Sequence, residues 1–328
     1  MPDRKKSLSI FSFNKKQKSF LKGALVFFIP VIAVYVILEI LVSQVPFNYV
    51  NISKQIASEG KSIKIITTGS SQMMCAVNPQ FFDQPAINFA SNSQHHKIDY
   101  NIITQTKDRL ESLDVVVLEL SYSHLEIAHN SKFFWKNNVY LKYYNVNNFE
   151  RNTYFKDKLI FLSEPEIYSK VIIDHYIKHK GVSKYNRFGF DENKFAGLFE
   201  ESNYEEDKIL KKSITINTDE SSYFFENNTE FLYKMLDYLS EEKLNVIVTT
   251  LPMHRYYLKD RNPNILKRRD SILELVLKNY NNVRAFRKEE DSINFITSDF
   301  KDHNHLNPRG AEKFTTELNT FIKEQFPN

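Results

Sequence analysis

The chain has 328 residues, a length that suits one large domain or one domain with a sizeable insertion. Apolar residues make up 42% of it, enough for a hydrophobic core, which excludes extensive disorder away from the ends. The net charge is +4, but residues 1–22 alone sum to +6, so the other 306 residues sum to −2. The folded part therefore carries no basic excess, and the sequence predicts no nucleic-acid partner.

Residues 1–19 form a basic arm, and residues 20–45 are predominantly apolar, with only Lys22 and Glu39 charged. About 20 apolar residues span a bilayer, so we predict a transmembrane anchor over 20–45. Lysines precede this segment and none follows soon after it, which predicts a cytoplasmic N-terminus and a periplasmic or extracellular C-terminal domain. A cleaved signal peptide is the rival interpretation, although its apolar region would be only ~7–15 residues long and no small-x-small cleavage site follows Leu41.

Residues 46–61 are predicted to be a linker with some helix, and residues 62–328 to be the folded domain. The single cysteine, Cys75, excludes an internal disulfide. We expect its side chain to be a small member of the core.

A β-branched run up to Thr68 is followed by Gly69, by Ser70 and Ser71, and by a helical segment that stops at Asn78. This pattern predicts a buried strand, a tight turn and a helix. Several hydrolase folds present a nucleophilic serine in this way, because the helix N-terminus favours an anion. An ordinary serine helix cap is the alternative interpretation.

Strands and helices alternate along the rest of the chain. We expect strands at 86–90, 115–120, 246–251 and 283–286, and helices at 98–112, 226–242, 265–279 and 308–326. The alternation predicts an α/β fold with a doubly wound parallel sheet, in which ligands bind at the carboxyl ends of the strands. Ser71, Ser91–Gln94 and Ser121–His124 all follow strand ends, so we expect them to converge on one site.

An insertion at about 125–225 is rich in aromatic residues, among them Phe133–Trp135. Aromatic rings stack on sugars, so a glycan groove or lid is one interpretation, and packing of the insertion onto the sheet is the other. His175 and His179 share a helical spacing but lack a third ligand nearby, and two surface histidines are expected. The chain has no phosphate loop or zinc motif, and we predict neither a cofactor nor a metal.

Asp302 and His305 lie three residues apart on a loop that ends at Asn307, where Pro308 opens the last helix. A carboxylate in this position can fix the tautomer of the imidazole, whose other nitrogen then takes a proton from a serine. His303 is a second histidine that could fill this role. A polar loop that only caps the last helix is the alternative interpretation.

Two blocks together resemble the SGNH/GDSL hydrolase superfamily: Gly69-Ser70-Ser71-Gln72 after the first strand, and Asp302-His303-Asn304-His305 before the last helix. The resemblance covers residues 62–125 and 243–326 and leaves the insertion unmatched. It implies an SGNH-like fold.

The resemblance also implies roles for individual residues. Ser71 would be the nucleophile, His305 the base and Asp302 the residue that orients the base. Ser70 stands where the family often has Asp. The backbone N–H groups of Ser71 and Ser93 would stabilise the oxyanion.

Two further family blocks are altered in this chain. The second block supplies an oxyanion N–H from a Gly shortly after an Asn, and here Asn88 matches the Asn while Ser93 stands near the Gly. The third block, usually Gly-x-Asn-Asp, is replaced by Ser121–His124, so the Asn that donates its amide is absent. Either Ser123 or Asn92 substitutes for it, or activity is low, because one lost donor costs on the order of a hundredfold in rate.

We predict a membrane-anchored esterase or O-acyltransferase that forms an acyl ester on Ser71 and acts on cell-envelope polysaccharide. Its expected partners are an acylated glycan or other acyl donor, the bilayer through residues 20–45, and a membrane acyltransferase. The alternative is a catalytically silent SGNH-fold protein that binds glycan or serves as a scaffold in a polysaccharide-assembly machine. The altered third block favours the alternative, and the intact Asp-x-x-His disfavours it.

Overall fold

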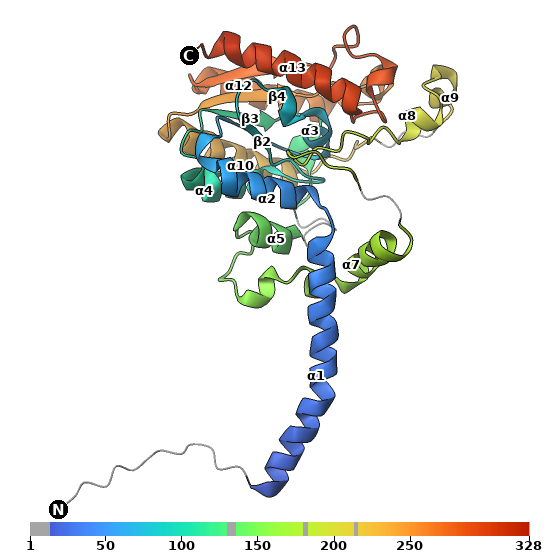
Figure 1. Ribbon diagram of the computed structural model, residues 1–328. Helices are drawn as coiled ribbons and strands as arrows, with labels where there is room; N and C mark the ends of the chain where they lie inside the picture. The colour runs from blue at the N-terminus through green and yellow to red at the C-terminus, as the bar shows by residue number, and fades with distance from the viewer. Residues whose placement is uncertain (1–13, 130–135, 180–182, 213–215, 328) are drawn as a thin grey trace, which may run out of the picture.

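The computed structural model describes residues 14–129, 136–179, 183–212 and 216–327. Residues 1–13 of the basic arm and the aromatic run Phe133–Trp135 lie outside the described residues. Figure 1 shows a head of strands and helices at one end of a long helix, α1.

A five-stranded, all-parallel sheet forms the centre of the head, with the order β2-β1-β3-β4-β5. The α/β fold with a parallel sheet is therefore confirmed. Its strands are rich in Val and Ile, as expected where both faces are covered. They are β1 (Ile65–Thr68), β2 (Ala86–Asn88), β3 (Val115–Glu119), β4 (Asn245–Thr250) and β5 (Val283–Arg287).

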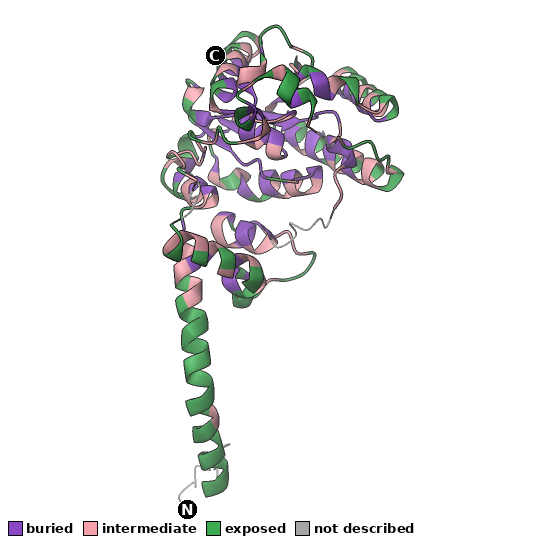
Figure 2. Cartoon of the chain, turned by 90° about the vertical axis from the view of Figure 1, so that its right-hand side faces the viewer, coloured by how far each residue is buried: buried purple, intermediate pink, exposed green. Residues whose placement is uncertain are grey.

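Helices cover both faces of this sheet, and the buried side chains lie between the layers (Figure 2). One layer consists of α2 (Asn48–Glu59), α4 (His96–Thr106), α10 (Ser222–Glu241) and α12 (Pro263–Asn279). The other is built on α3 (Ser71–Ala76) and α13 (Pro308–Gln325). The remaining helices are α1 (Lys15–Gln44), α5 (Lys136–Val139), α6 (Ile160–Ser163), α7 (Pro165–Ile172), α8 (Leu198–Glu201), α9 (Glu206–Leu210) and α11 (Arg255–Lys259).

Helix α2 occupies most of the segment that the sequence suggested as a linker. Its Ile52 and Ile56 are buried in the same core as the side chains of β1 and β3. The folded head therefore begins at α2, because the apolar face of this helix completes one layer over the sheet.

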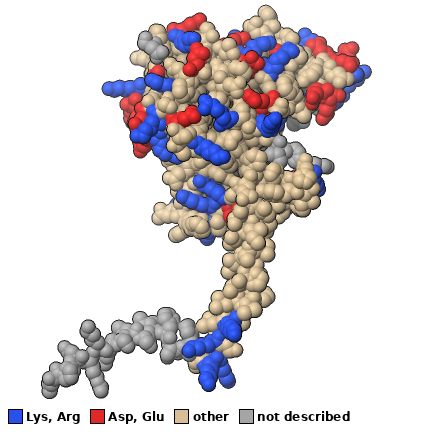
Figure 3. All heavy atoms as spheres, in the orientation of Figure 1, with Lys and Arg blue, Asp and Glu red and all other residues tan. Residues whose placement is uncertain are grey.

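Within the described part of the chain, α1 is the one helix long and apolar enough to cross a membrane. The side chains from Phe20 to Ile37 are exposed apart from half-buried Ala24, as Figure 2 shows along its length. Four lysines lie in its first eight residues and form the basic end seen in Figure 3: Lys15, Lys16, Lys18 and Lys22.

Part of the insertion packs against the last turns of α1 and not onto the sheet. Glu39 accepts hydrogen bonds from the backbone N–H groups of Ile160 (2.8 Å) and Phe161 (2.7 Å) and from Lys142 Nζ (2.9 Å). A small core joins α1 to α6 and α7, with buried members Val42, Val139, Ile160, Phe161, Tyr168 and Ile172. The prediction that the insertion packs onto the sheet thus holds for only part of it, such as α8 and α9.

Candidate active site

Ser71 is the first residue of α3 and follows the end of β1. Ser70 is the N-cap, and its side chain accepts a hydrogen bond from the Gln72 N–H (3.2 Å). Gly69, with φ +149°, makes the turn; a Cβ at this position would lie only 2.4 Å from a carboxylate oxygen of Glu119. Only glycine fits here, and the close turn brings the Ser71 side chain to the end of the sheet.

A hydrogen-bonded chain links Ser71, His305 and Asp302. Ser71 Oγ lies 2.8 Å from His305 Nε2, and His305 Nδ1 lies 2.9 and 3.1 Å from the two carboxylate oxygens of Asp302. All three residues are partly exposed, so a substrate can reach this hydrogen-bonded group of side chains. The structure thus brings together the three residues named for a triad, from segments more than 200 positions apart.

The loop before α13 fixes the orientation of the Asp302 carboxylate, the last member of the hydrogen-bonded chain. Asp302 Oδ1 also accepts the backbone N–H groups of Asn304 (3.2 Å) and His305 (3.0 Å). Burial raises the pKa of Asp302, but the hydrogen bond from His305 and the charge of Lys301 outweigh it and hold that pKa below its ordinary value. An ionised Asp302 accepts Nδ1–H, which leaves Nε2 as the acceptor for the Ser71 hydroxyl.

The neighbouring histidine, His303, lies away from Ser71. Its ring is buried and meets the ring of Phe199 edge-on, with centroids 5.4 Å apart. Its backbone carbonyl accepts the N–H of His254 (2.9 Å). His303 is therefore part of the packing beneath the loop, and the histidine next to the serine is His305.

Beneath the turn lies a buried ion pair that the sequence analysis did not identify. Glu119, at the end of β3, accepts the Ser70 backbone N–H at 2.6 Å and the Ser70 hydroxyl at 2.9 Å. Its carboxylate also lies 3.3 Å from His124 Nδ1, and both side chains are fully enclosed. The signal was present in the sequence: Glu119 is the only charged residue in the apolar run 115–120.

The two partners shift each other's pKa. Burial raises the pKa of Glu119, but His124 and the hydrogen bonds from Ser70 outweigh burial and leave that pKa below its ordinary value. Burial lowers the pKa of His124, but Glu119 and Asp99 outweigh it and raise that pKa. Each partner thus favours the charged form of the other directly behind the serine turn, and the hydrogen bonds of Glu119 fix the position of Ser70.

His96, Asp99 and His124 place three potential metal ligands within 4.8 Å of one another. The rings of His96 and His124 are stacked with centroids 4.5 Å apart and planes 3° apart. A metal ion lies in the plane of each imidazole that binds it, so two parallel rings cannot share an ion without rotating. Burial also raises the pKa of Asp99 to about 7. We therefore assign no metal to this cluster.

The loop after β2 lies next to the serine turn, because the Ser91 N–H donates to the Gly69 carbonyl (3.0 Å). Ser93 has φ +54°, the left-handed conformation that favours Gly, the residue the family uses near this position. Within the described residues, the backbone N–H groups of Ser71 and Ser93 donate to no protein acceptor. These two donors are the ones that the resemblance assigns to the oxyanion.

The other candidates lie less directly at the site. Asn92 is exposed, and its carbonyl accepts Lys136 Nζ (2.6 Å). Ser123 begins the turn after β3, and no hydrogen bond among the described residues joins it to Ser71. The Asn88 amide donates to the backbone carbonyls of Met73 within α3 (3.2 Å) and of Val77 at its C-cap (2.9 Å), so Asn88 holds the helix in place.

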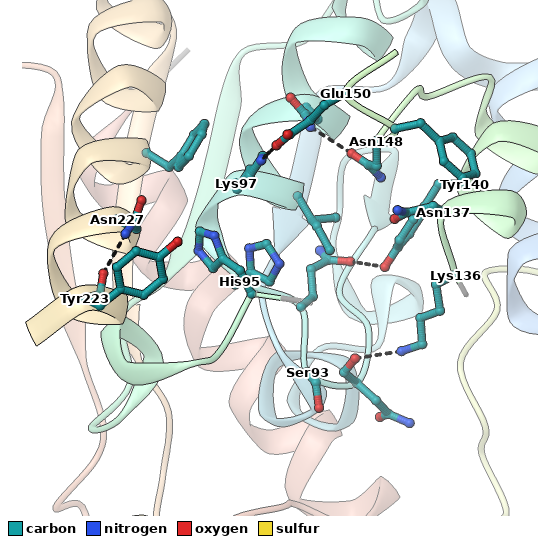
Figure 4. A pocket seen from close by; sticks show the side chains of 17 residues that line it. Ser93, His95, Lys97, Lys136, Asn137, Tyr140, Asn148, Glu150, Tyr223 and Asn227 are labelled. Carbon is teal, nitrogen blue, oxygen red and sulfur yellow. Dashed lines mark hydrogen bonds and ion pairs between the residues drawn. The ribbon is translucent and has the colours of Figure 1, made fainter. Parts of the chain in front are cut away.

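A pocket of about 490 Å³ opens beside Ser93 (Figure 4). Amide side chains and aromatic rings contribute to its wall: Asn101, Asn148, Asn227, Tyr223 and Phe231. His95 lines it too; its ring stacks on His129 with centroids 4.0 Å apart, and burial lowers the pKa of His95 to about 2. The pocket is therefore polar, uncharged over much of its wall and bordered by rings.

Lys136, on α5, lies on the right-hand side of this pocket in Figure 4. Its Nζ donates to Ser91 Oγ (2.9 Å), which also bonds to the Tyr49 hydroxyl (2.8 Å). Burial lowers the pKa of Lys136 to about 7. The insertion and α2 thus brace the loop that carries Ser93.

A scan against protein-family models finds no match to this chain, and a search of curated proteins finds no relative. The likeness to SGNH/GDSL hydrolases stays a prediction made from the motifs. The function has to be argued from the geometry of the site.

Proposed function

We propose that this protein is a membrane-anchored serine esterase or O-acyltransferase with an SGNH-like head, acting on cell-envelope polysaccharide. The observation that carries the proposal is the hydrogen-bonded chain from Ser71 Oγ to His305 (2.8 Å) and on to Asp302 (2.9 Å). Its position also supports the proposal. In a sheet with the order β2-β1-β3-β4-β5 the winding reverses between β1 and β3, where ligands bind in α/β folds.

In the first half-reaction His305 Nε2 takes the proton of Ser71 while Oγ attacks the acyl carbonyl. The oxyanion accepts the N–H groups of Ser71 and Ser93. As the tetrahedral intermediate collapses, the bond to the leaving alcohol breaks, and His305 gives the proton to that alcohol. An acyl ester of Ser71 remains.

In the second half-reaction water or a sugar hydroxyl attacks this ester and gives its proton to His305. Ser71 leaves and recovers the proton from His305. Water as acceptor makes the protein an esterase, and a sugar hydroxyl makes it an O-acyltransferase. Asp302 stays ionised throughout and stabilises the imidazolium.

The pocket beside Ser93 supports a glycan as one of the two substrates. Sugars are recognised by hydrogen bonds to their hydroxyl groups and by aromatic rings against their apolar faces. The amides of Asn101, Asn148 and Asn227 supply donors and acceptors, and Tyr223 and Phe231 supply rings. The lining avoids a strong charge of one sign, since Lys97 is paired with Glu150.

A fluorophosphonate tests the proposed chemistry. Attack by an activated serine displaces fluoride and leaves a stable phosphonate ester on the protein. With the full chain in detergent, we expect one adduct, located by mass spectrometry on Ser71. Absence of any adduct, together with no turnover of acyl esters, would contradict the proposal.

Asp302→Asn is expected to slow acyl-ester turnover by about 10⁴-fold, because an amide favours the wrong tautomer of His305. The measurement is kcat with a chromogenic acetyl ester. The matched control is Asp207→Asn, an exposed position on α9, which should leave kcat unchanged. Equal rates for Asp302→Asn and wild type would remove Asp302 from the mechanism.

We place the head outside the cytoplasm, because seven basic residues precede or open the apolar part of α1 and only three, Lys54, Lys61 and Lys64, lie within the twenty residues after the helix ends at Gln44. A reporter enzyme that works only outside the cytoplasm, fused after Asn328, should be active. Protease added to intact spheroplasts should cleave the head. A head protected from protease would reverse the orientation.

The second candidate is a catalytically silent protein of the same fold that binds glycan or a partner. It is favoured by the third block, where Ser123 replaces the amide donor and His124 is turned into the core toward Glu119. A silent protein would retain glycan binding in the pocket and show no fluorophosphonate adduct.

A further inference from the structure

The insertion carries exposed apolar side chains in the part that flanks α1. We call residues 154–177 the flanking segment; it includes α6 and α7. Five of its large apolar side chains are exposed: Tyr154 (65%), Phe155 (81%), Leu162 (49%), Ile173 (40%) and Ile177 (71%). So many apolar groups on one segment are unfavourable in water.

Contacts with α1 fix the height of this segment along the helix. The Phe161 ring packs edge-on against Tyr35, with centroids 6.0 Å apart. Higher up, the Tyr176 hydroxyl donates to the Leu41 carbonyl (3.0 Å). The flanking segment is therefore held at the level of residues 35–41, beside α1 in Figure 1.

This level lies within reach of lipid if α1 spans a bilayer. A helix rises ~1.5 Å per residue and the hydrocarbon core is ~30 Å thick, so a core that begins near Lys22 ends near Val42. Tyr35 is thirteen residues beyond Lys22, or ~20 Å, about 10 Å below that upper limit. If α1 is tilted, the heights of Tyr35 and Val42 along the bilayer normal both decrease.

We propose that the flanking segment lies in the lipid–water interface and inserts its exposed apolar side chains between the lipids. The bilayer is the occupant of this surface because it is continuous with the exposed apolar face of α1. Exposed lysines accompany the apolar groups: Lys156, Lys158 and Lys170 within the segment, and Lys178 directly after it. Their apolar stems and charged ends suit the headgroup region, where Tyr and Lys are enriched. Basic side chains gather beside the upper end of α1 in Figure 3.

Single-cysteine spin labelling tests this directly, since the only native cysteine, Cys75, is buried. The variants are Phe155→Cys and Ile177→Cys on the flanking segment. Ile293→Cys, 89% exposed on the head, is the water control, and Ile32→Cys on α1 is the lipid control. The full chain is placed in nanodiscs of phosphatidylethanolamine and phosphatidylglycerol.

Collisions of each label with oxygen, which concentrates in lipid, are compared with collisions with a water-soluble nickel chelate. We expect the oxygen-to-nickel ratio at 155 and 177 to resemble that at 32 and to exceed that at 293 severalfold. A ratio at 155 and 177 equal to that at 293 would overturn the inference, with α1 still in lipid. Labels at 155 and 177 that neither reagent reaches would also overturn it, in favour of contact with a second copy. A ratio at 32 as low as that at 293 would overturn both the membrane span of α1 and the interfacial position of the flanking segment.

Discussion

Ser71→Ala should lower acyl-ester turnover by about 10⁴–10⁶-fold and abolish the fluorophosphonate adduct. The Oγ atom 2.8 Å from His305 is the only oxygen of this residue that the proposed reaction uses, and alanine removes it. Folding should be little affected, because the hydroxyl is partly exposed and replaceable by water, at a cost of about 1 kcal/mol or less. The measurements are kcat, the labelled fraction by mass spectrometry and the midpoint of thermal unfolding.

Ser70→Ala is the control for this variant. It should lower the stability of the fold and leave the reaction of Ser71 with the fluorophosphonate intact. The Ser70 hydroxyl bonds to Glu119 (2.9 Å) and caps the Gln72 N–H (3.2 Å), so its loss should cost about 1–2 kcal/mol of stability. The adduct on Ser71 should still form. A Ser70→Ala protein without the adduct, beside a Ser71→Ala protein that keeps it, would move the nucleophile to Ser70.

Glu119→Gln should produce the largest loss of stability among single substitutions near the site, about 3–5 kcal/mol. The neutral amide leaves the imidazolium of His124 buried with Asp99 as its remaining acidic neighbour, 4.0 Å away, and burial raises the pKa of Asp99 to about 7. It also places an N–H₂ group beside the N–H and hydroxyl that Glu119 now accepts. The midpoint of thermal unfolding, followed by circular dichroism on the full chain in detergent, measures the effect.

Glu111→Gln provides a matched comparison, since it makes the same chemical change in an exposed ion pair with Lys61 (2.8 Å). Exposed ion pairs contribute little to stability, so the free energy of unfolding of this variant should lie within about 0.5 kcal/mol of the wild-type value. Equal losses in the two variants would mean that the pair beneath the turn is not ionised.

The parallel sheet could be predicted because runs such as Val115–Leu120 are apolar and β-branched, and because helices fill the intervals. The last helix could be placed to within a residue, since Asn307 and Pro308 mark its start. The serine turn and the Asp-x-x-His loop were visible for a similar reason. Each is a short motif whose local chemistry is contained in adjacent residues.

Other features depend on contacts that no short motif contains. Ser70 and Glu119 are 49 residues apart, and the parallel register of β1 and β3 brings them together. The helices of the insertion are four to eight residues long, too short for a clear apolar period. Their packing on α1 is set by tertiary contacts, with Glu39 as the central acceptor. These are the parts of the molecule that the sequence did not reveal.

Only three residues separate the end of α1 at Gln44 from the start of α2 at Asn48. Val45 is buried, and Phe47 packs edge-on against Tyr168 with centroids 6.4 Å apart, so the connection is short and held on both sides. A catalytic domain on a long flexible tether samples a large volume, and the effective concentration of its site is spread through it. Here the tether length is almost zero. Under the proposed function the serine would therefore stay in a thin layer at a constant height above the bilayer, and polymer that has grown or drifted beyond that layer would escape modification.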